Sequence, residues 1–199
     1  MGGNGIYELQ IMNTQTNIDS IKKILEGLLF AAHEPLSLEQ LAKLLTEDGQ
    51  PSFDKQELRT ILVNLATDYL EKGIELKEIA SGFRFQVREE LKPWVSKLWA
   101  EKPPRYSSAL LEILALIAYR QPITRGEIEE IRGVTLSSNI MQTLQEREWI
   151  AAVGYKDVPG RPALYATTKK FLDYFNLTSL ADLPILDDST DNSLTADIS

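Results

Sequence analysis

The chain has no cysteine and a single histidine among its 199 residues. Without cysteine it has no disulfide, no thiol nucleophile and no zinc site of the cysteine type. The histidine, His33, ends a helical pattern beside a proline, where a positive charge is favourable near the helix C-terminus. No Walker or Gly-x-Ser-x-Gly pattern occurs. We therefore predict a protein that is not an enzyme, with no catalytic residue, no metal site and no cofactor.

Long hydrophobic runs are also missing. No apolar stretch reaches the length that a membrane-spanning helix requires. The N-terminal residues do not combine a basic segment with a following apolar one, which a secretory signal would need. We expect a cytoplasmic protein that makes no contact with a membrane.

What the chain does contain is one helix-start signal, present twice. Ser37 and Gln40 have the spacing of a capping box, and so do Thr124 and Glu127, 87 positions further on (124 − 37). A proline stands two residues before each capping residue and marks a turn after another helical pattern. The repeat predicts a duplicated small domain with a helix–turn–helix corner in each copy.

A helix and then a β-hairpin follow each corner. The first copy has strand-like runs at 74–80 and 83–88, and the second has them at 149–155 and 163–167. This order is that of a winged helix, although it is also compatible with other small α+β folds. The predicted class is α+β and mainly helical, with two tandem winged-helix domains, each of three helices plus a small antiparallel β-hairpin wing.

The composition of the segments predicts where these domains begin and end. Polar residues dominate the N-terminus, and the C-terminus carries four aspartates with no lysine or arginine, which is typical of a disordered tail. Trp94 and Trp99 are expected to pack between the domains. The predicted order is a flexible leader at 1–17, winged-helix domain 1 at 18–88, a connecting helix and Pro-rich junction at 89–106, winged-helix domain 2 at 107–176, and a C-terminal segment with an acidic disordered tail at 177–199.

Residues 109–118 form a helical pattern that is apolar on nearly every side, with Glu112 as the exception. Such a helix is normally buried on several sides. It is either a fully buried core helix or has a second contact, with the other domain, a dimer mate or another protein.

Charge argues against the DNA-binding use of winged helices. The 21 lysines and arginines are outnumbered by 29 aspartates and glutamates, giving a net charge of −8. The predicted third helices, 54–72 and 137–148, each carry a net charge of −1, whereas DNA binding needs clustered cations. We therefore expect protein contacts, with weak or no direct DNA binding. The alternative, a DNA-binding transcription regulator, would need a basic face assembled across both domains.

Three stretches carry a family resemblance. The run 118–134, the predicted wing at 158–165 and the segment 171–177 resemble the signature of bacterial segregation and condensation protein B, and the resemblance extends over about residues 18–186. The start of the third helix, at 136–139, departs from the acidic or glycine-containing sequence expected there.

The resemblance implies a non-enzymatic subunit of a bacterial condensin-like complex. Such a protein has two winged-helix domains and forms a homodimer largely through the first. It binds the kleisin subunit, segregation and condensation protein A, which bridges a structural-maintenance-of-chromosomes ATPase. The implied role is chromosome condensation and segregation during cell division, at the nucleoid.

Three arginines of the second domain are the candidate partner-binding residues. Arg161 lies in the predicted wing tip between Pro159 and Pro162, while Arg125 and Arg132 lie on or beside the capped helix. Arginine suits bidentate recognition of carboxylates, so we expect these residues to contact the kleisin. The alternative is that the prolines only shape the wing and the arginines are solvated.

Overall fold

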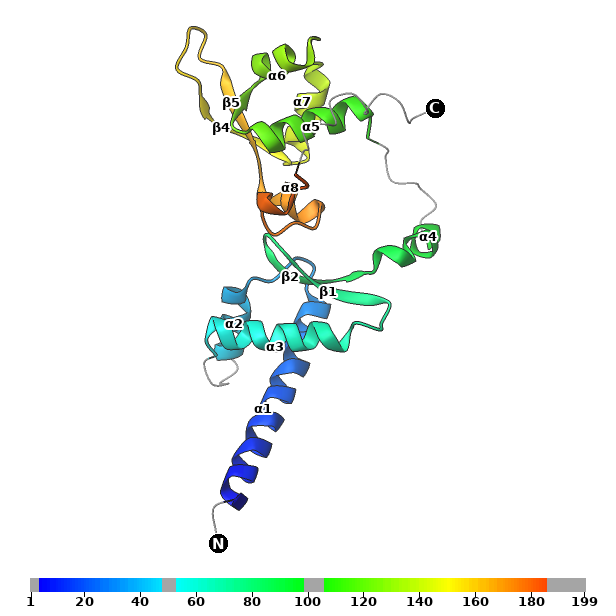
Figure 1. Ribbon diagram of the computed structural model, residues 1–199, viewed down its shortest axis with the longest axis vertical. Helices are drawn as coiled ribbons and strands as arrows, with labels where there is room; N and C mark the ends of the chain where they lie inside the picture. The colour runs from blue at the N-terminus through cyan, green and yellow to red at the C-terminus, as the bar shows by residue number, and fades with distance from the viewer. Residues whose placement is uncertain (1–3, 48–52, 99–105, 186–199) are drawn as a thin grey trace.

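The chain folds into two groups of helices and strands (Figure 1), and each has its own hydrophobic core. In the computed structural model, which describes residues 4–47, 53–98 and 106–185, one core lies in residues 4–87, the first unit, and the other in residues 106–185, the second unit. The first unit consists of α1 (Asn4–Ala31), α2 (Leu38–Glu47), α3 (Lys55–Asp68), β1 (Ile74–Ile79) and β2 (Gly82–Val87). This order of helices and hairpin is the predicted one.

Apolar residues at helical spacing build the first core. Ile21, Leu25 and Leu29 follow one another at four-residue intervals along α1 and are buried against α3. The helix begins at Asn4, so residues 4–17 are helical, which corrects the expected flexible leader.

Both predicted capping boxes are present. The backbone N–H of Ser37 donates to Gln40 Oε1 (2.8 Å) and that of Gln40 donates to Ser37 Oγ (3.3 Å). Thr124 and Glu127 repeat the pattern, with the Thr124 N–H 2.8 Å from Glu127 Oε2. The residue before the first corner, Leu36, also pairs with the hairpin, since it exchanges two backbone hydrogen bonds with Phe83.

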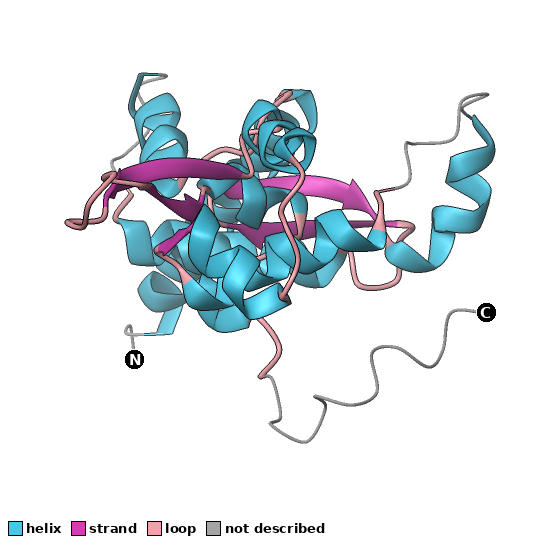
Figure 2. Ribbon diagram, turned by 90° about the horizontal axis from the view of Figure 1, so that it is seen from above, coloured by secondary structure: helices cyan, strands magenta, loops and turns pink. Residues whose placement is uncertain are grey.

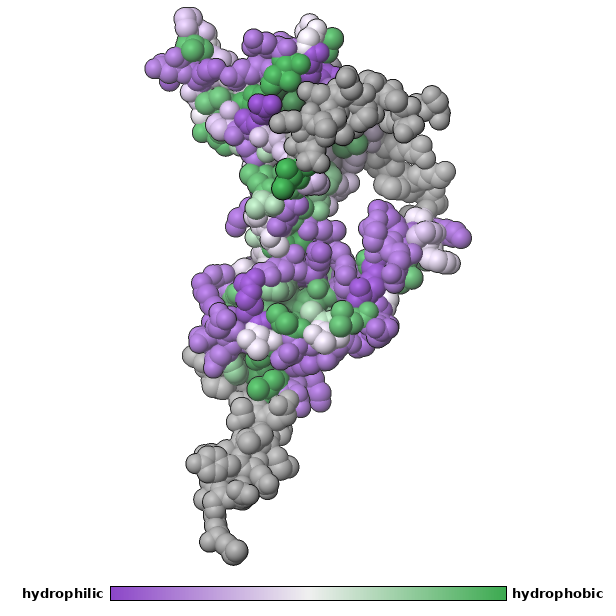
Figure 3. Space-filling view, viewed as in Figure 1, coloured by the Kyte–Doolittle hydropathy of each residue, from purple (hydrophilic) through white to green (hydrophobic). Residues whose placement is uncertain are grey.

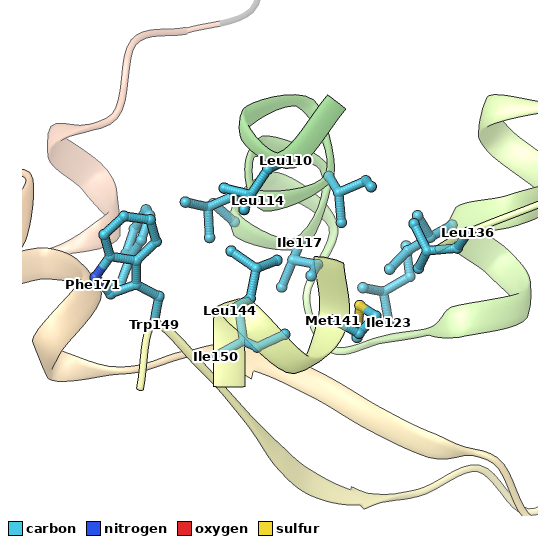
Figure 4. Close-up of a cluster of buried hydrophobic side chains, with 13 residues drawn as sticks. Leu110, Leu114, Ile117, Ile123, Leu136, Met141, Leu144, Trp149, Ile150 and Phe171 are labelled. Atoms are coloured by element: carbon cyan, nitrogen blue, oxygen red, sulfur yellow. The ribbon is translucent and has the colours of Figure 1, made fainter. Parts of the chain in front are cut away.

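The second unit repeats this plan and adds a C-terminal helix. Its sheet has the order β3-β5-β4 and is antiparallel throughout. Figure 4 shows its core, in which Ile117 of α5 lies next to Leu144, and Trp149 lies beside Phe171. Its elements are α5 (Ser108–Arg120), β3 (Ile123–Thr124), α6 (Arg125–Arg132), α7 (Ser138–Glu146), β4 (Ile150–Tyr155), β5 (Ala163–Thr167), α8 (Lys169–Tyr174) and the 3-10 turn Leu180–Asp182.

The connector between the units stands away from both sheets (Figure 2). It consists of the 3-10 turn Glu89–Leu91, the short helix α4 (Lys92–Val95) and a second 3-10 turn, Ser96–Leu98. The side chain of Trp94 is 64% exposed, so the prediction that it packs between the domains is wrong. Trp99 lies outside the described residues.

The units contact each other instead through the β1–β2 hairpin and the end of α8 together with the residues that follow it. The backbone N–H of Ala80 donates to the carbonyl oxygen of Leu177 (2.9 Å), and Arg84 donates to Asn176 Oδ1 (2.8 Å). Aromatic contacts fix α8 in turn: the ring of Trp149 lies 4.6 Å from that of Tyr174, centroid to centroid. A polar contact on a well-anchored helix therefore joins the two units.

Candidate protein-binding surface

The hairpin β4–β5 is held against the start of α6. Lys156 Nζ donates to Glu127 Oε1 at 2.6 Å, and the other carboxylate oxygen accepts from Thr124. The hydrogen bond from Lys156, followed by those from Thr124, lowers the pKa of Glu127 to about 2. Lys156, a cation of this hairpin, is thus engaged in a contact within the protein.

Arg161, the arginine predicted at the wing tip, lies exposed between β4 and β5. Gly160 and Arg161 both adopt positive φ (86° and 39°), and the backbone N–H of Arg161 donates to the carbonyl of Val158 (2.9 Å). Positive φ is uncommon for a residue with a side chain. Within the part of the chain that the structure describes, the Arg161 guanidinium has no ion pair, so its charge is available to a partner.

Apolar side chains accompany Arg161 on this hairpin. Val153 and Tyr155 are 60% and 66% exposed, and Val158 is also exposed. The pairing of β4 with β5 shifts register between Ala152 and Gly154, which leaves Val153 as the extra residue of a bulge. Because bulges re-aim side chains, this one favours an apolar contact surface on the wing.

Arg125 forms hydrogen bonds within the second unit, so its guanidinium is not free for a partner. Its guanidinium donates to Glu129 Oε1 (3.1 Å), to Ser138 Oγ (3.2 Å) and to the carbonyl oxygen of Leu136. Glu129 also accepts from the Leu136 N–H (2.8 Å), and these bonds lower the pKa of Glu129. Together they fix the loop between α6 and α7.

Arg132 is also paired within the chain. Its guanidinium donates to Glu112 Oε2 on α5 (2.8 Å), and its side chain is only 14% exposed. The three arginines predicted to contact a partner are therefore not gathered into one cationic patch: Arg125 and Arg132 are engaged in the fold, and Arg161 alone projects from the wing.

The contact between Arg132 and Glu112 lies among exposed apolar residues that the sequence did not single out. Ile131 and Val134 lie beside Arg132, Leu111 precedes Glu112, and all three are exposed. The all-round apolar pattern of α5 was the signal for this surface. Most of that helix is buried, including Ile113, but Leu111 remains 43% exposed.

Hydrophobic surface also gathers over α3 in the first unit (Figure 3). Val63 on that helix and Leu70 just beyond it are both exposed. The two residues are seven positions apart, which places them on the same side of a helical path.

The charges on α3 and α7, the third helices of the two units, do not match a surface that binds DNA. The two cations of α3, Lys55 and Arg59, form ion pairs with Glu39 (2.5 Å) and Glu78. Helix α7, Ser138–Glu146, contains no lysine or arginine. A phosphate backbone would meet little free positive charge on either helix.

Across 4–47, 53–98 and 106–185, no three His, Asp or Glu side chains are grouped so that they could hold a metal ion. In the same ranges no helix combines the length and the apolar character needed to cross a membrane.

Known proteins with sequences similar to this chain are subunits of chromosome segregation and condensation complexes. Residues 23–186 match the family described as segregation and condensation complex subunit ScpB, and the chain belongs to that family. A segregation and condensation protein B homolog of Coxiella burnetii is 55% identical over 170 residues, covering 85% of this chain and 80% of the relative. Segregation and condensation protein B of Syntrophotalea carbinolica is 44% identical over 173 residues, covering 86% and 84%.

Among solved structures, the chain is similar to one described as a dimer of the ScpB N-terminal domain complexed with ScpA peptide. Sequence identity is 30% and the TM-score is 0.37, with 41% of this chain and 98% of that chain covered. The similarity therefore concerns less than half of the present chain.

Proposed function

We propose that this protein is the kleisin-binding subunit of a bacterial condensin-like complex, with no catalytic activity of its own. It acts in the cytoplasm, at the nucleoid, and supports chromosome condensation and segregation during cell division. Membership of a family named for a complex subunit supports an assembly role. Through the kleisin, segregation and condensation protein A, the subunit connects to the structural-maintenance-of-chromosomes ATPase.

The two units are winged-helix domains used for protein contacts, and the second is the main kleisin contact. The observation that carries this proposal is the wing, where Arg161, which has no ion pair among the described residues, accompanies the exposed apolar side chains of Val153 and Tyr155. Interfaces combine such apolar contacts with arginine, which is enriched where binding energy concentrates. The carboxylates of a kleisin segment would pair with Arg161.

The first unit makes the homodimer, within residues 18–88. Its exposed apolar residues Val63 and Leu70 supply a surface that self-association would cover. A dimer places two copies of the wing on one particle, which raises the effective concentration of the second contact once the first has formed.

A pull-down with the kleisin of the same organism, followed by light scattering on the eluted complex, tests the proposal. We expect a complex whose mass contains two copies of this chain. Arg161→Glu should reduce the recovered kleisin, whereas Lys169→Glu, an equal charge reversal outside the wing, should not. Failure of the unaltered protein to retain the kleisin would overturn the assignment.

A further inference from the structure

We propose that Lys156 and Glu127 are positioning residues for the wing: their ion pair holds Arg161 in one place before a partner's carboxylate arrives. Lys156 Nζ lies 2.6 Å from Glu127 Oε1. Neither residue needs to touch the partner for this role. The inference rests on the proposed function, because it explains how the wing contact assigned to Arg161 is prepared before binding.

The wing extends beyond the last row of three paired strands. Leu164 of β5 pairs with Thr124 of β3 on one side and with Gly154 of β4 on the other. Thr124 is the last residue of β3, so the hairpin continues past this row with two strands alone. A two-stranded hairpin by itself is only marginally stable in water. The orientation of the wing therefore depends on contacts outside the hairpin.

Strand β4 is irregular at the same row. Its register shifts between Ala152 and Gly154, which leaves Val153 in a bulge, and a bulge bends the strand that contains it. A Cβ placed on Gly154 would meet no neighbouring atom within 4 Å, so nothing packs closely on this residue. Glycine within a strand also weakens it. The wing can therefore tilt here unless a residue beyond Gly154 is held, and Lys156 is two positions beyond it.

The ion pair of Lys156 supplies the outside contact. Lys156 follows β4 and Glu127 follows β3, and these are the two outer strands of the sheet. The ion pair therefore links the chain segments on either side of β5. Among the described residues, it is the one hydrogen bond or ion pair that joins residues 156–162 to an element outside the hairpin.

The carboxylate that receives Lys156 is itself fixed. Glu127 Oε2 accepts from the N–H and the hydroxyl of Thr124, at 2.8 and 2.7 Å. Thr124 is buried and belongs to β3. Ion pairs between exposed side chains are usually weak because two long side chains must be ordered to form them. Here the capping box has already ordered the carboxylate, so only the lysine side chain loses freedom.

The loop after Lys156 transmits the restraint to Arg161. The backbone N–H of Lys156 donates to the carbonyl oxygen of Pro162 (2.9 Å), which closes the base of the loop. At the tip, Pro159 and Gly160 occupy the middle of a turn closed by the backbone N–H of Arg161. Proline followed by a glycine with positive φ (86°) is typical of a type II turn. Because the loop is fixed internally, holding Lys156 also holds the backbone that carries Arg161.

A wing fixed in advance binds more tightly because less freedom remains to be lost on association. The alternative is that Lys156 contacts the partner's carboxylates directly. The two roles make opposite predictions for Glu127→Gln. Glutamine preserves the capping box but gives up the ion pair, which frees the lysine. A direct contact would then become stronger, whereas a positioned wing would bind more weakly.

Two measurements on the full chain test the proposal: ¹⁵N relaxation of the free protein, and calorimetry with the central segment of the kleisin from the same organism. We expect the backbone order parameters of Gly160 and Arg161 to be lower in Glu127→Gln and Lys156→Met than in the unaltered protein. Both variants should bind the segment about fivefold more weakly. Lys156→Arg should restore wing order and affinity, because arginine keeps the ion pair with Glu127.

Lys170→Met is the matched control. It removes another ion pair of the second unit, with Glu148, that lies outside the wing. The order parameters of the wing and the affinity for the segment should both stay as in the unaltered protein. Arg161→Glu serves as the reference for the wing contact itself.

The outcomes separate this inference from the proposed function. If Arg161→Glu weakens binding but Glu127→Gln binds as tightly as the unaltered protein or more tightly, the inference is overturned and the wing contact stands. Equal order of the wing in Glu127→Gln, Lys156→Met and the unaltered protein would overturn it as well. If Arg161→Glu has no effect, or the unaltered chain does not bind the segment, the proposed wing contact fails and the inference fails with it.

Discussion

The Asp173 carboxylate accepts hydrogen bonds from both the backbone N–H and the hydroxyl of Ser81, at 3.0 and 2.5 Å. The two residues are 92 positions apart, one in α8 and the other in the turn of the β1–β2 hairpin. Arg84 reinforces the contact by donating to the backbone carbonyl of Asp173 (3.3 Å). This polar contact joins the two units, in place of the tryptophan packing that the sequence suggested.

We predict that Asp173→Ala loosens the orientation of the two units without unfolding either. The substitution removes both acceptors for Ser81 but deletes no buried apolar group. Because the chain has no cysteine, spin labels at Asn64→Cys and Glu130→Cys report one distance without interference. Electron–electron double resonance should show a broader distance distribution for Asp173→Ala. Asp157→Ala, at the wing, should leave the distribution narrow.

The second prediction distinguishes Arg125 from Arg161 by their contributions to stability, although the sequence made both candidates for partner binding. Arg125→Ala removes the donors to Leu136, Ser138 and Glu129 and should lower the free energy of unfolding by about 1–2 kcal/mol, since these groups are partly exposed. Arg161→Ala should change it by less than about 0.5 kcal/mol, as expected for an exposed residue. Urea denaturation measures both values, and equal effects of the two substitutions would contradict the different roles assigned to them.

The third prediction concerns acid stability. The pKa of Glu127 is lowered to about 2 from an ordinary 4.5, so its carboxylate stabilises the folded state above pH 4.5, and this contribution is lost as the pH falls toward 2. Glu127→Gln should therefore be less stable than the unaltered protein at neutral pH, with the difference shrinking through that window. Denaturation at a series of pH values measures it. Glu130→Gln, on the same helix, is the control, and a difference that stays constant with pH would count against the Lys156 contact.

The fourth prediction is that duplex DNA binds negligibly. The net charge is −8, and the cations of α3 are already paired with Glu39 and Glu78. Fluorescence anisotropy with labelled duplex at low salt gives electrostatic binding its best conditions. No saturable signal at micromolar protein is expected. Sequence-selective saturation there would favour the DNA-binding regulator over the protein-binding subunit.

Local features of the fold were predictable from the sequence and non-local ones were not. Ser37 with Gln40, and Thr124 with Glu127, form capping boxes because each interaction spans three residues and depends on little else. The partner of Arg125, by contrast, is a carbonyl 11 positions away whose placement depends on how the loop after α6 folds.

The same distinction explains the corrections. The contact between Ser81 and Asp173 requires both units to be folded, and no pattern in the sequence predicts it. Trp94 was expected between the domains because it belongs to the predicted connecting helix, but the contact between the units is made by the turn at Ser81. In the candidate site, Arg161 was identifiable from the prolines around it, whereas the exposed Val153 depends on a bulge that only the strand pairing reveals.

The most direct test of the central claim is calorimetry of the full chain with the central segment of the kleisin from the same organism. We expect saturable binding that Arg161→Glu weakens about tenfold or more, because the reversed charge repels the carboxylate that arginine would pair with. Lys169→Glu should bind as the unaltered protein does. Absence of heat and of complex formation with the unaltered chain would contradict the account.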